Sequence, residues 1–274
     1  MRTRFAPSPT GPLHLGHAYA AILAHDMARA AGGAFLIRIE DIDRSRARPE
    51  WEAQNFDDLR WLALAWEEPV LRQSDNLAAY RAALARLTDA GLTYPCACRR
   101  RDIEAALTAP QEGDPPIGPD GPVYPGTCRH LGLGEAGNAI RLDMARAATG
   151  PVRFTDELRG EVTLSPEEMV AGIGDVILAR RDMGTSYHLS VVVDDAAQGI
   201  THVTRGEDLF EATAIHALLQ DRLGLPRPVY HHHRLIRDAS GKRLAKRDDA
   251  RAISRYREEG ASPADVRRMV GLPG

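Results

Sequence analysis

Two histidines and a glycine near the start of the chain have the spacing of a phosphate site. His14 and His17 flank Gly16 in the segment HLGH, where a loop meets an expected helix. A helix N-terminus offers backbone N–H groups and a positive dipole end, which suit phosphate, and glycine lets a ligand approach closely. Residues three apart lie on one helix face. The segment therefore predicts a nucleotide phosphate site, with two polar side chains at a helix cap as the alternative.

Lysine is almost absent from the chain. Lysine and arginine together number 35, yet only Lys242 and Lys246 are lysines, both in the segment SGKRLAKRDD. A lysine ammonium is a compact point charge on a flexible stem, whereas a guanidinium is planar. A glycine-led loop could bring Lys246 onto a triphosphate held at His14 and His17, where it would stabilise developing negative charge. We therefore predict that His14, His17 and Lys246 are catalytic residues.

All three cysteines lie between positions 96 and 128. Cys96 and Cys98 form the segment CAC, and Cys128 lies in YPGTCRH between Tyr124 and His130. An odd number of cysteines argues against a disulfide framework. Zinc takes four N, S or O ligands and stabilises segments that have little core of their own. We predict a zinc site, with a reduced apolar cysteine cluster as the alternative, and the residues alone leave the fourth ligand open between Tyr124 and His130.

An α/β fold must position these residues. Residues 3–9, 15–33 and 34–41 are expected to form a strand, a helix and a strand, which implies a parallel sheet with ligands at its carboxyl edge. Further helices are expected over 50–67, 74–91 and 210–224, and further strands over 138–144, 152–164 and 228–236. Two or three strands are expected within 175–209, of which SVVVDD (190–195) would be the most buried, and 109–128 is expected to be an irregular loop.

Several blocks carry a family resemblance. PSPTGPLHLGH and GKRLAKR resemble the two signature sequences of class I aminoacyl-tRNA synthetases, and LIRIEDIDRSR, SYHLSVVVDD and THVTRGEDL resemble blocks of the glutamyl branch. The resemblance covers nearly the whole chain and implies a Rossmann-like catalytic fold. It divides the chain into a first catalytic half (1–90), an acceptor-binding-like insertion with the zinc site (91–185), a second catalytic half (186–235) and a signature loop with a short helical segment (236–274).

The resemblance also implies which residues bind the substrates. ATP would contact His14, Gly16, His17, Arg243, Leu244, Ala245, Lys246 and Arg247. Glutamate would contact Arg4, Phe5, Ala6, Pro7, Ser8, Glu40, Tyr187 and Arg205. An arginine can form a bidentate pair with a carboxylate, although a surface salt bridge to Glu207 or Asp208 is the alternative for Arg205. The second signature departs from the family at Arg243 and Ala245, so Lys242 either replaces the displaced lysine or is solvated.

The chain is expected to lack the anticodon-reading domain of a glutamyl-tRNA synthetase. Together with the CAC…YPGTC spacing, this resembles the glutamyl-queuosine tRNA(Asp) synthetase family, whose pattern favours Tyr124 as the fourth zinc ligand. The resemblance implies activation of glutamate by ATP and magnesium, then transfer to queuosine at the wobble position of tRNA(Asp). The alternatives are a truncated glutamyl-tRNA synthetase that charges a 3′ end and a non-catalytic tRNA-binding or regulatory protein.

Composition sets the remaining bounds. The 274 residues are 43% hydrophobic and 27% charged with a net charge of −3, which is ordinary for a globular protein and excludes a chain-wide basic nucleic-acid binder. No apolar run reaches the about 20 residues of a membrane span, and the N-terminus lacks the apolar core of a secretory signal. We therefore expect a cytoplasmic monomer with no membrane partner.

Overall fold

The computed structural model describes residues 1–107, 116–237 and 251–273, which form two compact units. The first unit comprises Met1–Asp75, Gly199–Asp208 and Pro228–Gly274. The second comprises Asn76–Gln198 and Leu209–Arg227. Each unit is thus built from segments far apart in the sequence. The expected boundaries at 90, 185 and 235 stay predictions.

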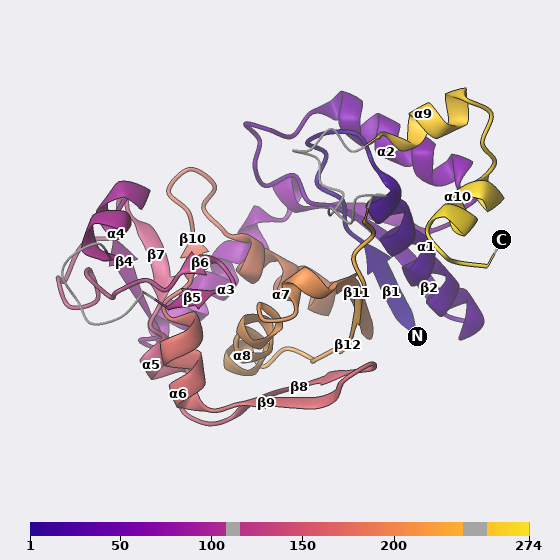
Figure 1. The fold of residues 1–274 in the computed structure, drawn as a ribbon. Coiled ribbons are helices and arrows are strands. Elements are labelled where there is room, and N and C mark those ends of the chain that lie inside the picture. Colours follow the sequence, from indigo (N-terminus) through magenta and orange to yellow (C-terminus); the bar gives the residue numbers. More distant parts are fainter. Residues whose placement is uncertain (108–115, 238–250, 274) are drawn as a thin grey trace. The chain divides into compact units, whose positions relative to one another are not determined.

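The first unit is organised around parallel strands. Its elements are β1 (Arg2–Phe5), α1 (Leu15–Ala30), β2 (Ala34–Ile39), α2 (Pro49–Trp61), β3 (Glu67–Arg72), η1 (Gln73–Asp75), β11 (His202–Gly206), β12 (Val229–His233), α9 (Ile253–Glu258) and α10 (Pro263–Met269). Strands β1, β2 and β3 form a parallel sheet in that order, and β11 pairs in parallel with β12 (Figure 1). The predicted strand–helix–strand unit and its parallel pairing are confirmed.

Strand β11 runs beside β1 in the same direction. The Thr201 amide donates to the Arg2 carbonyl at 2.9 Å, and two residues further along β1 the Arg4 side chain donates to the Thr204 carbonyl at 3.2 Å. The carboxyl ends of β1, β2, β11 and β12 therefore lie at one edge, which is where ligands bind in sheets of this kind.

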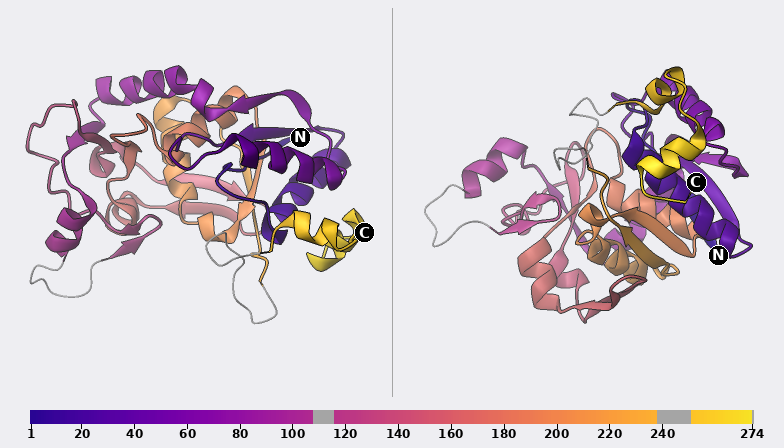
Figure 2. Two further views of the ribbon diagram at one scale, coloured as in Figure 1. Left: turned by 90° about the horizontal axis from the view of Figure 1, so that it is seen from above. Right: turned by 45° about the vertical axis from the view of Figure 1, so that its right-hand side comes forward.

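Apolar burial holds this unit together. Helix α1 buries alanines and Ile22 against Phe35 and Ile37 of β2, and it stops before Gly32, whose φ of 61° favours glycine. Helices α9 and α10 insert the fully buried Ile253 and Val266 into the same core. The second of these helices, α10, packs beside α1, and Figure 2 shows the yellow C-terminal helices next to the indigo N-terminal part of the first unit.

The second unit combines antiparallel strands with helices. Its elements are α3 (Leu77–Asp89), β4 (Thr93–Cys96), α4 (Arg100–Leu107), β5 (Ile117–Gly118), β6 (Gly121–Pro122), β7 (Ala139–Leu142), α5 (Met144–Ala147), β8 (Val152–Asp156), β9 (Gly160–Leu164), α6 (Pro166–Glu168), η2 (Met169–Ile173), β10 (Ile177–Ala179), α7 (Tyr187–Ala197) and α8 (Thr213–Leu223). The short 3₁₀ helix η3 (Glu207–Leu209) precedes α8. Strand β7 lies between β4 and β10 and is antiparallel to both, while β8–β9 and β5–β6 are hairpins.

Three expectations about secondary structure are wrong. SVVVDD lies within α7 rather than in a strand, because Ser186 caps the helix and Asp194 is held inside by the Tyr80 hydroxyl at 2.8 Å, so tertiary packing outweighs the β-branched composition. The helix expected to reach residue 67 ends at Trp61, and β3 starts at Glu67. The described part of the expected loop, residues 116–128, contains the β5–β6 hairpin.

Among the helices of the described residues, none is both long and apolar enough to cross a bilayer.

Candidate active site and metal centre

The HLGH segment forms a tightly bonded helix start in the first unit. His14 is the N-cap of α1, and its Nδ1 accepts from the Gly16 amide at 3.1 Å, while His17 Nδ1 accepts from the His14 amide at 3.1 Å. Because both Nδ1 atoms accept backbone protons, each neutral imidazole carries its proton on Nε2. The two ring centroids lie 3.8 Å apart, so both imidazoles stand at one helix start, where the predicted phosphate site would need N–H donors.

Gly16 is required by the packing of this helix start. A Cβ placed at Gly16 would lie 3.0 Å from Cε1 and 3.1 Å from Nδ1 of the His14 ring. A side chain there would require the His14 imidazole to shift by a few tenths of an ångström. The glycine therefore maintains the histidine geometry, in addition to any contact with a ligand.

Three charged residues of the predicted glutamate site lie at the carboxyl edge of the parallel strands. Arg4 is the penultimate residue of β1, Arg205 is the penultimate residue of β11, and Glu40 directly follows β2. Arg4 is 5% exposed and Arg205 is 6% exposed. Arg205 is therefore a buried cation rather than a surface group.

Neighbouring residues orient Glu40 and the opening segment. The fully buried Arg38 donates from Nη2 to Glu40 Oε1 at 3.0 Å, and the Glu40 side chain is 12% exposed. The Glu40 amide donates to the Pro7 carbonyl at 3.0 Å, which ties the segment Ala6–Ser8 to the end of β2. The backbone thus places the two predicted glutamate-binding stretches side by side.

His232 is a member of this site that the sequence did not reveal. Its Nε2 accepts from Arg205 Nε at 3.2 Å, and the Tyr230 ring lies beneath the Arg205 guanidinium at 5.1 Å. His232 and Tyr230 belong to β12, which pairs with β11. The HHH tract offered only strand periodicity as a signal, and the pairing partner that gives His232 its role is remote in the sequence.

Tyr187 and the residues of the second signature are the remaining predicted substrate contacts. Tyr187 belongs to the second unit, as the first residue of α7, and its ring contacts His188 and His216 edge-on at 5.5 and 5.6 Å. The predicted signature residues Arg243, Leu244, Ala245, Lys246 and Arg247, and the neighbouring Lys242, lie outside the described residues.

The three cysteines converge with Tyr124 in the second unit. The sulfur atoms of Cys96, Cys98 and Cys128 lie within 4.8 Å of one another. The Tyr124 hydroxyl is 3.4 Å from the sulfurs of both Cys96 and Cys98, and it accepts from the Cys128 amide at 2.9 Å. We call these four residues the cysteine cluster. Three sulfurs and one oxygen at this separation form a donor set of the kind that a structural metal ion uses.

The chemistry of the cysteine cluster favours a cation. Burial tends to raise the pKa of the Cys128 thiol, but hydrogen bonds from Tyr124 and Cys98 outweigh it and lower the pKa to about 7. Burial raises the pKa of Cys98 to about 11. The pKa values of the two thiols thus shift in opposite directions, and a bound cation would favour the thiolate form of both.

His130 does not take part in the cysteine cluster. Its side chain is exposed, and it is not among the donor atoms that gather around Cys96, Cys98 and Cys128. Of the two candidates for the fourth ligand, Tyr124 lies at the sulfurs and His130 does not.

Comparison with known proteins identifies the family. The family described as tRNA synthetases class I (E and Q), catalytic domain, matches residues 1–274. The chain belongs to this family. It is 67% identical to the Glutamyl-Q tRNA(Asp) synthetase of Rhodobacter capsulatus, covering 99% of this chain and 100% of that protein. It is 43% identical to the protein of the same name from Nocardia farcinica, covering 98% and 85%.

Solved members of the class share the fold. A glutamate tRNA ligase from Elizabethkingia meningosepticum, crystallised in complex with its amino acid, superposes with a TM-score of 0.80 at 28% identity. The match covers 99% of this chain and 60% of that ligase, so the chain spans less than two thirds of it. Mycobacterium tuberculosis methionyl-tRNA synthetase bound by methionyl-adenylate matches with a TM-score of 0.64 at 11% identity, which shows the fold alone.

Proposed function

We propose that this protein activates L-glutamate with ATP and transfers the glutamyl group to queuosine at the wobble position of tRNA(Asp). The observation that carries the proposal is the 67% identity to a Glutamyl-Q tRNA(Asp) synthetase over the full length of that relative. The protein would thus be an ATP-dependent ligase that modifies a tRNA. The buried charges of the first unit are consistent with this chemistry.

Glutamate carries two carboxylates and one ammonium, and the carboxyl edge of the first unit offers the complementary charges. Arg4 and Arg205 are buried guanidinium groups, either of which can pair bidentately with a carboxylate. Glu40, oriented by Arg38, is the anion suited to the α-ammonium. Phe5, Ala6, Pro7 and Ser8 would line the same stretch, and Tyr187 would add a hydroxyl.

Activation needs no protein nucleophile. An oxygen of the glutamate α-carboxylate attacks the α-phosphorus of ATP, and the bond to the pyrophosphate oxygen breaks to give glutamyl-adenylate. The Nε2–H groups of His14 and His17 would donate to phosphate oxygens, since their Nδ1 atoms are already bonded to the backbone. Lys246 would add its ammonium, and magnesium, when bound, neutralises phosphate charge. Arg243, Leu244, Ala245 and Arg247 would line the nucleotide.

Transfer then releases AMP. A nucleophilic group of queuosine attacks the acyl carbon of the adenylate, and the bond to the AMP oxygen breaks. The acceptor base lies in the single-stranded anticodon loop, where bases can be unstacked and bound by a protein.

Zinc is the metal we infer for the cysteine cluster. Cys96, Cys98 and Cys128 supply thiolates and Tyr124 supplies the fourth donor, a set that fits a closed structural site. Such a site stabilises the second unit and takes no part in the reaction. We also propose that the protein acts as a cytoplasmic monomer, for which sedimentation of the purified protein is the test.

Two assays test the proposed function. ATP–pyrophosphate exchange with glutamate in the absence of tRNA should be positive, and labelled glutamate should then reach tRNA(Asp) that contains queuosine but not the same tRNA with guanine. Absence of exchange would contradict an activating enzyme. Exchange followed by transfer only to a 3′ hydroxyl would instead identify a 3′-end-charging synthetase.

A further inference from the structure

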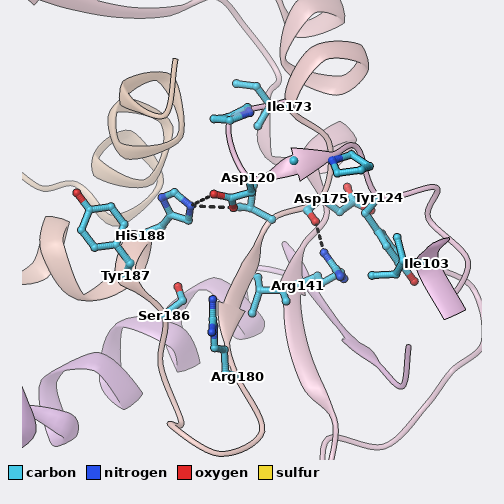
Figure 3. Close-up of a pocket in the computed structure, with 15 residues that line it drawn as sticks. Ile103, Asp120, Tyr124, Arg141, Ile173, Asp175, Arg180, Ser186, Tyr187 and His188 are labelled. Atoms are coloured by element: carbon cyan, nitrogen blue, oxygen red, sulfur yellow. Dashed lines mark hydrogen bonds and ion pairs between the residues drawn. The ribbon is translucent and has the colours of Figure 1, made fainter. Parts of the chain in front are cut away.

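The second unit contains a cavity of about 320 Å³ to which no role has been assigned (Figure 3). Its walls come from the β5–β6 hairpin, from β7, from the segment around β10 and from the start of α7. The volume is typical of a small-molecule site. Tyr187, for which glutamate binding is proposed, lines the cavity.

A carboxylate is held in position inside the cavity. Figure 3 shows the His188 imidazole directed at Asp120, where Nε2 lies 3.1 Å from Oδ1 and 2.9 Å from Oδ2. On its other side, His188 Nδ1 contacts His216 Nε2 at 3.0 Å, and both imidazoles are buried. The Asp120 side chain itself is 57% exposed. A fixed carboxylate therefore faces the cavity with lone pairs left to accept further hydrogen bonds.

Two arginines also line the cavity. Arg141 is buried, stacks on the Tyr124 ring at 3.8 Å and donates from Nη1 to the Asp175 carbonyl at 2.7 Å. Arg180 is exposed and lines the same cavity. Burial tends to raise the pKa of Asp120, but the His188 hydrogen bond and the charges of Arg180 and Arg141 outweigh it and lower the pKa. The carboxylate is thus ionised at neutral pH.

The second carboxylate of the cavity is already satisfied. Asp175 accepts from the Arg129 guanidinium at 2.7 Å, from the Tyr94 hydroxyl and from the Met144 amide at 2.9 Å. Of the two carboxylates, Asp120 is therefore the one that can accept hydrogen bonds from a ligand. The rest of the wall is mostly apolar or aromatic, with Ile173, Ile177 and Tyr187, and Ser186 adds a hydroxyl. A ligand that fits is flat, apolar on its faces, and carries adjacent N–H donors on one edge.

We propose that this cavity binds the guanine-type base of the acceptor nucleotide, unstacked from the anticodon loop. This inference rests on the proposed function and deepens it. The guanine edge carries N1–H and the 2-amino group side by side, and the two oxygens of Asp120 accept from that pair. Queuosine keeps this edge, since its modification lies on the opposite side of the base.

The same chemistry gives selectivity. Adenine presents a ring nitrogen acceptor where guanine presents N1–H, so it would place a lone pair against the Asp120 carboxylate. The exposed Arg180 guanidinium is suited to the phosphate of the same nucleotide, which positions the base without reading it. Asp120 thus specifies the base, and Arg180 contributes affinity for any sequence.

Binding of defined RNA tests this division of roles. The probes are synthetic anticodon stem–loops of tRNA(Asp) with queuosine, guanosine or adenosine at the wobble position, measured by fluorescence anisotropy. The full-length protein should bind the first two about tenfold or more tightly than the third. Asp120→Asn should lose about tenfold in affinity for the queuosine probe and most of the discrimination. Arg180→Ala should weaken all three probes by a similar factor.

Asp182→Asn is the matched control, because Asp182 is an exposed carboxylate near Arg180 that does not line the cavity. It should bind all probes as the unmodified protein does, and melting curves verify that each variant is folded. Lack of discrimination in the unmodified protein, or full discrimination in Asp120→Asn, overturns the inference. ATP–pyrophosphate exchange with glutamate and glutamate transfer to queuosine tRNA are assayed separately. Positive results in these two assays would leave the proposed function intact even if the inference about the cavity fails.

Discussion

The two units use different physical means to position functional side chains. In the first unit, Arg4, Glu40 and Arg205 extend from the carboxyl ends of parallel strands, and His14 caps a helix that packs on those strands. In the first unit, regular backbone structure positions the functional side chains. In the second unit, the cysteine cluster brings together a strand end, a loop and a tyrosine, and its small core consists of Tyr94, Cys96, Tyr124 and Cys128.

Because of this difference, changes in the first unit should affect mainly activity, and changes at the cysteine cluster should affect mainly stability. The first unit buries a large apolar core that includes the C-terminal helices, so removing one of its functional side chains should alter chemistry more than folding. The core around the cysteine cluster is too small to be stable by apolar burial alone, so the proposed metal should carry much of its stability. Each prediction below tests one side of this comparison.

Loss of the metal should have the largest effect. A structural zinc contributes on the order of 10 kcal/mol of binding free energy, so Cys128→Ala should remove the metal and unfold this part of the second unit. Hydrogen exchange should accelerate over 93–98 and 121–133 but not in α1 or β2. Equal acceleration in both units would contradict the comparison, and zinc analysis of the purified protein gives the expected ratio of one ion per chain.

Arg205→Ala should have the second-largest effect. It removes a buried cation proposed to hold a glutamate carboxylate, so kcat/KM for glutamate in ATP–pyrophosphate exchange should fall about 1000-fold, or about 4 kcal/mol. Arg2→Ala, which removes a half-exposed arginine that pairs with Glu67 at 3.4 Å, is the control and should change the rate less than twofold. Parallel losses in both variants would show that the effect is not specific to the site.

Lys246→Arg tests the sequence-based catalytic assignment. The charge is kept but the compact ammonium is lost, so kcat in exchange should fall about 100-fold. Lys242→Arg, four positions earlier in the sequence, is the matched variant, and a similar loss there would show that Lys242 replaces the lysine missing at Arg243. An unchanged rate in Lys246→Arg would remove Lys246 from the mechanism.

Tyr124→Phe should have a moderate effect on the metal. Loss of the hydroxyl 3.4 Å from two sulfurs should weaken zinc binding about tenfold or more, measured by competition with a chelator. His130→Ala should bind zinc as tightly as the unmodified protein, because His130 lies apart from the sulfurs. The reverse ranking would assign the fourth ligand to His130.

The smallest effect is expected at the C-terminal helices of the first unit. Arg267 pairs with Asp26 at 2.7 Å, and burial, which raises the pKa of Asp26, is outweighed by this pair and by His25. A carboxyl whose pKa is lowered on folding stabilises the protein above its unfolded pKa, and this contribution is lost as the pH falls through the folded pKa. Arg267→Ala should therefore cost less than about 1 kcal/mol at pH 7, and chemical unfolding should show this cost shrinking as the pH falls through the folded pKa of Asp26.

Sequence reasoning predicted the regions where local pattern controls structure. The strand–helix–strand unit, the helix ends near Gly32 and Gly91, and the strand structure within 152–164 are as expected. It failed at SVVVDD, where burial on several sides of α7 overrides the strand preference of valine. It also missed His232, Asp120 and His188, since each acquires its role from a partner 27 to 68 residues away.

The chain by itself determined which chemistry is available: two histidines at a helix start, cations and an acid at strand ends, and three thiols close in sequence. These features follow from side-chain type and from the short-range geometry of helices and strands. Only the tertiary structure decided that Tyr124 rather than His130 lies at the sulfurs, that Arg205 is buried against His232, and that Asp120 faces a cavity. Those outcomes depend on the packing of residues remote in sequence, which no local spacing encodes.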